Sequence, residues 1–281
     1  MANATMRYPG GKAKALTLSY DDGVFEDVRL IDIMTRHGLK GTFNLNAGHM
    51  NAAKKPAESH RERLNADQAR ALYRPSGNEV AVHGYTHPHL EGLTRERMTY
   101  EIMMDRLGLE ELTGEIVRGM AYPYGTTSDE VVDCLRACGI AYARTVTSTG
   151  GFALPENTSG WLRLPATCHH NDARLFSLAE QYAGRTPRPY DPALMFYLWG
   201  HSYEFTINDN WHVIERFAEQ MGGHEDIWYA TNIEIYEYVE AYRQLCWSAN
   251  GNVVHNPTAT TLYFNDGTMP VVLGAGETKV F

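Results

Sequence analysis

The stretch Ala15-Leu16-Thr17-Leu18-Ser19-Tyr20-Asp21-Asp22-Gly23 joins an apolar run to two adjacent carboxylates. The run predicts a strand over residues 15–20. Two like charges at close range resist joint ionisation, so an aspartate pair at a buried strand end needs a cation or a proton beside it. Because successive strand side chains point to opposite faces, one aspartate can bind a metal while the other handles a proton. The alternative is a plain surface turn, since Asp and Gly are common turn residues.

Strands and helices alternate along the chain beyond this stretch. A helix predicted over 27–37 and a strand over 41–46 complete a βαβ unit, which favours parallel strands. The continuous apolar run at 194–199 predicts a strand buried on both faces. The other predicted elements are strands at 79–83, 116–121, 140–144, 161–164 and 227–230 and helices at 65–73, 94–112, 128–138, 172–182, 211–221 and 231–245. Roughly seven such strands predict an α/β fold, a distorted (β/α)7-type barrel whose reacting groups follow the strand ends.

Three segments fall outside this alternation. We expect residues 1–14 to form a loose arm and residues 47–63 to form a loop over the strand ends. The turn residues Asn265-Asp266-Gly267 lie between two short apolar runs and predict a β-hairpin. We therefore expect two domains: a barrel over residues 1–249 and a small C-terminal β appendage over residues 250–281.

Composition argues against several classes of function. The net charge of -9 disfavours binding to nucleic acid or to an anionic membrane, because such proteins use basic surfaces. The 281 residues are 43% hydrophobic, which is enough for the core of one large domain. Residues 1–14 lack the apolar segment of a signal peptide. The four cysteines form no CxxC pair and are interpreted as free thiols. We therefore expect a cytoplasmic protein, with a trimmed secreted form left open.

A second polar cluster, His83-Gly84-Tyr85-Thr86-His87, begins where the predicted strand at 79–83 ends. The spacing of His83 and His87 suits one turn that presents two imidazoles to one ion, and neutral imidazole is the commonest metal ligand. With a strand-end aspartate they provide three protein ligands and an open fourth position, as in catalytic zinc sites. The alternative is a core His83 and a surface His87. We expect His89 to stay solvated.

Two further clusters follow strands. Pro123, Tyr124 and Gly125 come after the strand at 116–121, in a turn whose N–H groups can donate to an oxyanion. His201 comes after the strand at 194–199, where it faces the barrel mouth and can act as a general acid. Glu204 or another carboxylate could orient it. A strand-exit turn and a mouth histidine without chemistry are the alternatives.

In this order, the clusters resemble the motifs of the polysaccharide deacetylase family, also called the NodB-homology domain or carbohydrate esterase family 4. Tyr20-Asp21-Asp22-Gly23 is similar to its Phe-Asp-Asp-Gly motif, and His83 with His87 is similar to its histidine pair. Tyr122-Pro123-Tyr124-Gly125 is similar to its Arg-x-Pro-Tyr-Gly motif, and His201 is similar to the histidine of its Leu-x-His motif. The resemblance covers about residues 16–245 and implies a distorted (β/α) barrel.

The resemblance also implies a hydrolase that removes acetyl groups from a carbohydrate, N-linked groups more than O-linked ones. Asp22, His83 and His87 would bind a divalent metal, commonly Zn2+, with Co2+, Ni2+ or Mn2+ as alternatives. Asp21 would be the general base and His201 the general acid. The substrate and oxyanion side of the site is assigned to Tyr124, Pro123, Gly125, Arg144 and Trp199. The expected partner is an acetylated carbohydrate, and the oligomeric state stays open.

The chain departs from the family's motifs in two ways. The motif arginine would fall at Ala121, so Asp21 needs another partner, and Arg144 at a strand end is a better candidate than Arg118. The family's Asp-x-x-Asp-Trp motif has no clear match. That region instead contains Trp161, His169, His170 and Asp172. Two alternatives therefore remain: hydrolysis of a small non-sugar amide on the same fold, and a non-catalytic carbohydrate-binding protein with a relic metal site.

Overall fold

The structure is a computed structural model that describes residues 4–50 and 62–281. Its centre is a parallel sheet in the order β7-β6-β5-β4-β3-β2-β9-β8. These strands are β2 (Lys14–Asp21), β3 (Gly41–Leu45), β4 (Glu79–Val82), β5 (Gly119–Ala121), β6 (Tyr142–Ser148), β7 (Leu164–Ala166), β8 (Cys168–His169) and β9 (Leu194–Gly200). All pairs in this order are parallel, as the alternating pattern predicts.

One short segment joins the two ends of this sheet. β7 pairs with β6, and β8, which follows after one residue, pairs with the end of β9. Between them, the Thr167 N–H donates to the Tyr197 carbonyl at 2.8 Å. The sheet therefore curves back on itself, which confirms the predicted α/β fold with a distorted (β/α)7-type barrel.

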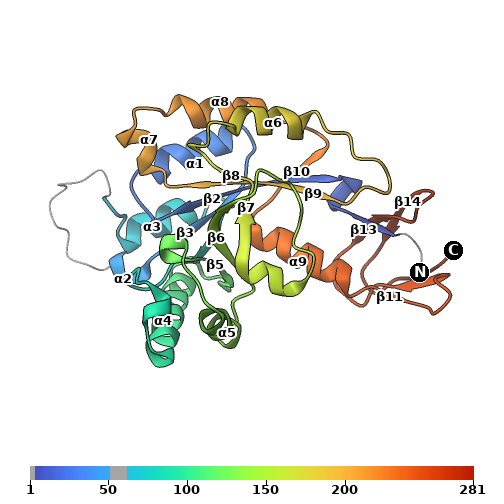
Figure 1. The fold of residues 1–281 in the computed structure, drawn as a ribbon, viewed down its shortest axis with the longest axis horizontal. Helices are drawn as coiled ribbons and strands as arrows, with labels where there is room; N and C mark the ends of the chain where they lie inside the picture. The colour runs from blue at the N-terminus through green and yellow to red at the C-terminus, as the bar shows by residue number, and fades with distance from the viewer. Residues whose placement is uncertain (1–3, 51–61) are drawn as a thin grey trace.

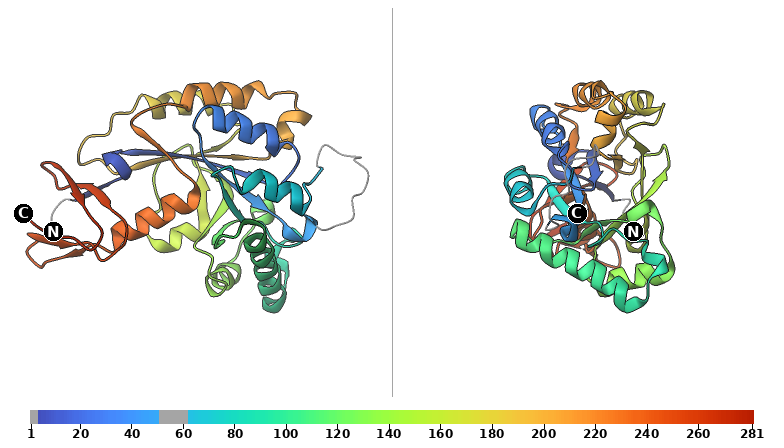
Figure 2. Two further views of the ribbon diagram at one scale, coloured as in Figure 1. Left: turned by 180° about the vertical axis from the view of Figure 1, so that it is seen from behind. Right: turned by 90° about the vertical axis from the view of Figure 1, so that its left-hand side faces the viewer.

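Helices surround the barrel, and Figure 1 shows them in two groups on opposite sides of it. One group is α1 (Asp27–Arg36), α6 (Leu175–Ala183), α7 (Tyr203–Ile207) and α8 (His212–Met221). The other is α2 (Ala47–Met50), α3 (Ala66–Tyr73), α4 (Arg95–Thr113) and α5 (Asp129–Ala137). α9 (Asn232–Arg243) runs toward the C-terminal strands, as the view from behind in Figure 2 also shows.

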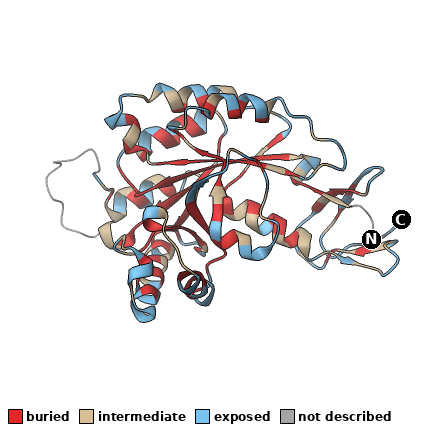
Figure 3. Cartoon of the chain, viewed as in Figure 1, coloured by how far each residue is buried: buried red, intermediate tan, exposed pale blue. Residues whose placement is uncertain are grey.

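Burial follows from the sequence pattern of each element. Every residue of β2 is buried, so its charged end lies inside the protein (Figure 3). Helices turn one apolar face inward, and in α1 this face includes Leu30, Ile33 and Met34. Side-chain caps start α3, α4, α5 and α9, and in α9 Thr231 and Glu234 form a capping box. Among the described residues, none of the helices has the length and apolar character needed to cross a membrane.

Four expectations about local structure need correction. The strand expected at 161–164 is a 3-10 helix over Thr158–Arg163, because the Asn157 side chain caps the Gly160 N–H, and only Leu164 begins β7. The strand expected at 227–230 is β10 (Ile227–Tyr229), which pairs with the start of β2 but lies outside the order of strands that forms the barrel. The expected arm contains β1 (Thr5–Arg7) and the first residue of β2. The loop expected at 47–63 starts with α2, and its residues 51–61 lie outside the described residues.

The C-terminal region forms two small antiparallel sheets, in the orders β1-β13-β14 and β11-β12-β15. Their strands are β11 (Cys246–Trp247), β12 (Val253–His255), β13 (Leu262–Asn265), β14 (Pro270–Leu273) and β15 (Thr278–Val280). The predicted hairpin is β13 with β14. β1 also joins this region, and the Tyr238 hydroxyl donates to the Arg7 carbonyl at 2.7 Å. The division at residues 249 and 250 stays a prediction.

Gly200, the last residue of β9, is predicted to tolerate no side chain. A Cβ there would lie 2.1 Å from His170 Nδ1, and the buried His170 ring is held between Tyr20 and Phe205. We expect Gly200→Ala to lower the free energy of unfolding by about 1–3 kcal/mol, as overpacking does. Gly92, where a Cβ would meet open space, is the matched control. Equal urea midpoints for the Gly200→Ala and Gly92→Ala variants would contradict this packing.

Candidate metal centre and active site

The two carboxylates sit at the carboxyl edge of the barrel, where β2 ends. Asp21 is the last residue of β2, and Asp22 follows with a left-handed backbone (φ 86°), which non-glycine residues adopt rarely. The Asp22 N–H donates to the Asn44 carbonyl of β3 at 3.0 Å, which holds this turn. Both aspartates are more than nine-tenths buried, and the turn gives each carboxylate its own set of neighbours.

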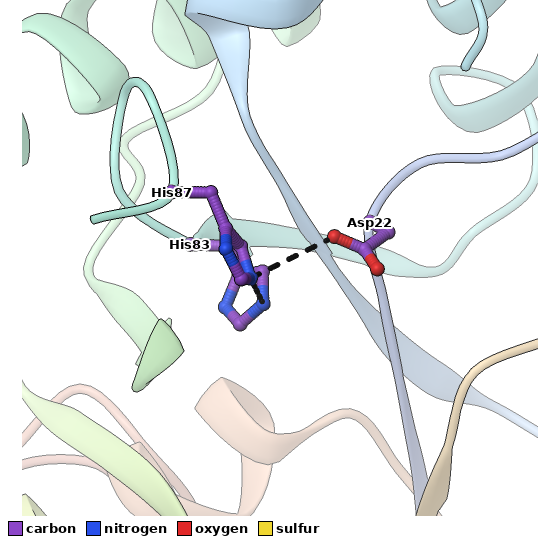
Figure 4. Close-up of side chains that lie close together, drawn as sticks. All are labelled: Asp22, His83 and His87. Atoms are coloured by element: carbon purple, nitrogen blue, oxygen red, sulfur yellow. Dashed lines mark hydrogen bonds and ion pairs between the residues drawn. The ribbon is translucent and has the colours of Figure 1, made fainter. Parts of the chain in front are cut away.

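The structure brings Asp22, His83 and His87 together, as Figure 4 shows. His83 follows β4, and His87 lies one turn later with a left-handed backbone (φ 56°). The His83 Nε2 and His87 Nε2 atoms are 3.2 Å apart, and His87 Nε2 is 3.8 Å from Asp22 Oδ1. One ligand atom of each residue lies within 4.8 Å of the others. Such a group can converge on one ion.

The protein orients His83 for this task. Its Nδ1 lies 2.8 Å from the Ala121 carbonyl, so Nδ1 carries the proton and Nε2 keeps a free lone pair. Burial lowers the pKa of His83. Burial, then the neighbouring His83, lowers the pKa of His87 to about 4. Both imidazoles are therefore neutral at pH 7, which is the form that binds a metal.

Arg144 takes the place of the arginine missing at position 121. Ala121 of β5 and Arg144 of β6 are direct neighbours in the parallel register, so the guanidinium arrives from the next strand at the same level. Arg144 Nη2 donates to Asp21 Oδ1 at 2.6 Å and also contacts Oδ2. Burial would raise the pKa of Asp21, but the Arg144 charge and two histidines lower it to about 2. Arg118 instead pairs with Glu237 on the surface.

His201 follows β9 and faces the aspartate pair from the other side. Its Nε2 lies 3.8 Å from Asp21 Oδ2, and its Nδ1 lies 3.3 Å from Glu204 Oε1. Burial would lower the pKa of His201, but the carboxylates of Glu204 and Asp21 raise it above its ordinary value. The next residue, Ser202, is anchored by a hydrogen bond to the buried Asp27 carboxylate. His201 thus lies opposite the ligand set, in surroundings that favour its protonated form.

Two further histidines, His169 at the end of β8 and His170 directly after it, lie close to Glu204. His169 Nε2 lies 3.2 Å and His170 Nε2 lies 2.9 Å from Glu204 Oε2. Burial would raise the pKa of Glu204, but hydrogen bonds from these imidazoles and His201 lower it. The Asn171 N–H donates to His169 Nδ1 at 3.1 Å, and the other ring nitrogen of His169 faces Glu204. The Glu204 carboxylate therefore lies within ion-pair distance of three imidazoles, including that of His201.

The predicted oxyanion turn lies beside the metal centre. Pro123–Gly125 form a short 3-10 turn in which Tyr124 has a left-handed backbone (φ 59°). The Gly125 N–H is used by the Tyr122 carbonyl and Pro123 has no N–H, so Tyr124 is the turn residue that can donate to an oxyanion. The half-exposed Tyr124 ring stacks on the exposed His89, with centroids 3.8 Å apart. This stacking was not foreseen for His89.

The sequence assigns Arg144 and Trp199 to the substrate side of the site, but both are buried inside the barrel. Arg144 is 1% exposed and Trp199 is 8% exposed. The Arg144 guanidinium lies over the Trp199 ring, 4.4 Å from its centroid. The two side chains pack against each other inside the barrel, where Arg144 holds Asp21 and the Trp199 ring lies beside the rings of His169 and His201. The mouth beside the metal centre is a cavity of about 290 Å³ lined by Asp22, Val24, His49, Arg63, Thr86, His87 and Tyr124.

Sequence reasoning missed three residues that organise the site. Asn44 Nδ2 donates to Asp21 Oδ1 at 2.8 Å, and Asn46 Nδ2 donates to the His83 carbonyl at 2.7 Å. Their alternation at the end of a predicted strand was a usable signal, because residues two apart share a face. Arg63 contacts Asp22 from a segment with no motif, so no local pattern could have found it.

Comparisons with known proteins confirm the resemblance. Residues 8–143, slightly less than half of the chain, match the family model of polysaccharide deacetylases. No curated protein matches the chain. Several solved structures share the fold at low sequence identity.

A Mycobacterium smegmatis protein assigned as a polysaccharide deacetylase has a TM-score of 0.59 at 16% identity, over 86% of this chain and 96% of the other. The family 4 esterase domain of a xylanase from the hindgut metagenome of Trinervitermes trinervoides has a TM-score of 0.50 at 17% identity, over 81% and 92%. A mutant of a Bacillus anthracis pseudoenzyme of this family, with restored enzymatic activity, has a TM-score of 0.50 at 17% identity, over 83% and 70%.

Removal of Arg144 is predicted to leave a buried carboxylate without its partner. We expect Arg144→Met to lower the free energy of unfolding by about 3–5 kcal/mol at pH 7. Asp21 has a lower pKa folded than unfolded, so its ionised form stabilises the wild type above about pH 4, and this contribution is lost as the pH falls toward 2. The gap between the two proteins should therefore shrink in acid.

The matched control is Arg118→Met, which removes a surface pair and should cost less than about 1 kcal/mol. Denaturant unfolding from pH 7 down to pH 3 measures both variants. Equal losses for the two variants at pH 7 would contradict the assigned partner of Asp21.

Proposed function

Because residues 8–143 match the polysaccharide deacetylase family, we propose that this chain is a metal-dependent hydrolase that removes acetyl groups from a carbohydrate. N-acetyl groups are favoured over O-acetyl groups, because an amine leaves only after protonation and His201 is held as a proton donor. One observation carries the proposal. Asp22, His83 and His87 converge beside Asp21 and His201 at one edge of the barrel.

The residues present fit a divalent metal. Two nitrogens and one carboxylate oxygen are a common catalytic zinc set, and ligand atoms on tetrahedral Zn2+ lie about 3.3 Å apart for bonds of about 2.0–2.1 Å. The 3.2 Å between His83 Nε2 and His87 Nε2 matches this value. Zn2+ is therefore our first choice, with Co2+, Ni2+ or Mn2+ as alternatives. When bound, such an ion would polarise the acetyl carbonyl and acidify water.

The surrounding side chains divide the proton transfers between them. Asp21 Oδ2 lies 3.9 Å from His83 Nε2 and 3.8 Å from His201 Nε2, so it sits between the ligand set and the acid. We assign Asp21 as the base that takes a proton from water, and Arg144 keeps its carboxylate ionised. We assign His201 as the acid that protonates the departing amine. The Tyr124 N–H is assigned to the oxyanion.

Two alternatives keep their own support. The doubtful match to the family's substrate motif leaves room for a small non-sugar amide as the substrate. A relic site is the second alternative, since the similar structures include a mutant of a pseudoenzyme of the family. Complete sets of candidate ligands, base and acid in this chain argue against a relic. The proposed partner stays an acetylated carbohydrate.

Variants of the two aspartates are predicted to separate metal binding from turnover. Asp22→Ala removes one of three ligands, so we expect the loss of stoichiometric Zn2+ binding. Asp21→Asn keeps the ligand set but removes the base, so we expect Zn2+ to be retained and acetate release to fall by roughly 100-fold or more. Metal content by elemental analysis and acetate release from chitin, peptidoglycan and xylan fragments measure the two effects.

The control is Asp67→Asn, which makes the same change at an exposed residue of α3 and should alter neither quantity. Normal turnover by metal-loaded Asp21→Asn would overturn the base assignment. Absence of acetate release from every acetylated sugar by the metal-loaded wild type would overturn the proposed function, and release from a small acetylated amide alone would favour the first alternative.

A further inference from the structure

Asp22 has a positively charged neighbour that the proposed chemistry does not use. Arg63 Nη2 donates to Asp22 Oδ1 at 2.8 Å, and Arg63 Nη1 donates to the Asp22 carbonyl at 2.6 Å. Asp22 Oδ1 is also the oxygen that lies 3.8 Å from His87 Nε2. The guanidinium therefore holds the same carboxylate oxygen that faces the histidine ligands.

Each aspartate of the pair thus has its own arginine, but the two arginines are placed differently. Arg144 is 1% exposed and contacts Asp21, which lies outside the ligand set. Arg63 is 26% exposed and lines the same cavity as Asp22 and His87. Only Arg63 therefore brings its positive charge next to the position that a cation would take.

The backbone keeps Arg63 in this position. The Phe25 N–H donates to the Glu62 carbonyl at 2.8 Å, and the Leu64 N–H donates to the Gly23 carbonyl at 3.0 Å. These bonds pair the residues on both sides of Arg63 with the turn that follows Asp22. Arg63 Nη1 also donates to Asn46 Oδ1 at 2.5 Å, and Asn46 in turn holds the His83 carbonyl. The guanidinium is therefore hydrogen-bonded directly to Asp22 and, through Asn46, is linked to His83.

We infer that Arg63 is a positioning residue that weakens the binding of the metal cation by Asp22, His83 and His87. This inference rests on the proposed metal centre. A fixed positive charge near a divalent cation repels it, and a carboxylate that shares its electrons with a guanidinium donates less to the metal. Arg63 would thus lower the affinity of the site for the cation and keep the cation exchangeable. Because less negative charge is donated to the cation, it would also polarise a bound carbonyl or water more strongly.

The test separates the effect of the positive charge at residue 63 from the effect of its hydrogen bonds. Arg63→Gln removes the charge and Arg63→Lys keeps it, and both shorten the side chain and lose the forked hydrogen bonds. We expect Arg63→Gln to bind Zn2+ with a Kd at least roughly tenfold lower than that of Arg63→Lys, because the lysine keeps a positive charge beside the cation and the glutamine does not. Competition with a chromophoric chelator measures the Kd on the full chain. The Co2+ absorption spectrum reports whether the ligand set is unchanged.

Two further variants make each outcome decisive. Arg70→Gln removes an exposed charge that pairs with Asp67, and it should leave the Kd unchanged. Asp22→Ala should abolish tight binding. If the wild type binds no Zn2+, or Asp22→Ala binds it normally, the proposed metal centre falls. If the wild type and Asp22→Ala behave as expected but Arg63→Gln binds Zn2+ no tighter than Arg63→Lys, this inference alone is overturned.

Discussion

The site depends on the ion pair between Asp21 and Arg144 inside the barrel. A buried carboxylate at the end of a fully buried strand would be costly without a partner, and a second carboxylate beside it adds repulsion. The strand register solves both problems, since it places Arg144 of β6 beside Ala121 of β5, and the Arg144 guanidinium reaches Asp21. Because the charge of Arg144 balances that of Asp21, the left-handed turn at Asp22 can present the second carboxylate to the histidines.

The same division of labour applies to the histidines. His83 is fixed by a carbonyl at Nδ1, so its Nε2 is a lone-pair donor suited to a metal. His201 has a carboxylate 3.3 Å from its Nδ1, and the surrounding carboxylates raise its pKa, which favours the protonated form suited to a leaving group. The group beside Nδ1 therefore decides what each imidazole can do. A carbonyl makes His83 suited to bind a metal, and a carboxylate makes His201 suited to give a proton.

Much of this arrangement could be predicted from the sequence, because strand periodicity and polar residues at strand ends are local signals. They identified β2, β9 and the groups at Asp22, His83, His87 and His201. Residues far apart in the chain were harder. The strand register brings Arg144 onto Asp21, and a single pair of backbone hydrogen bonds brings Arg63 onto Asp22. Arg144 is nevertheless the candidate partner of Asp21 in the sequence, because it ends a predicted strand, whereas no spacing pattern points to Arg63.

The region without a family match shows the same limit. Trp161 is buried in a 3-10 helix where a strand was expected, and Asp172 pairs with Arg174. His169 and His170 instead reach Glu204, which lies more than thirty residues later on α7. The largely apolar and partly aromatic run at 161–164 favours a strand, but the Asn157 side chain caps the Gly160 N–H and the segment forms a 3-10 helix.

The central claim is that one cation is shared by β2 and the turn after β4. Anomalous diffraction at the zinc absorption edge, from crystals of the zinc-loaded protein, tests it most directly. The account predicts one strong peak about 2.0–2.2 Å from an Asp22 carboxylate oxygen, His83 Nε2 and His87 Nε2. A map in which these three side chains share no peak, while zinc lies elsewhere or is absent, would contradict it.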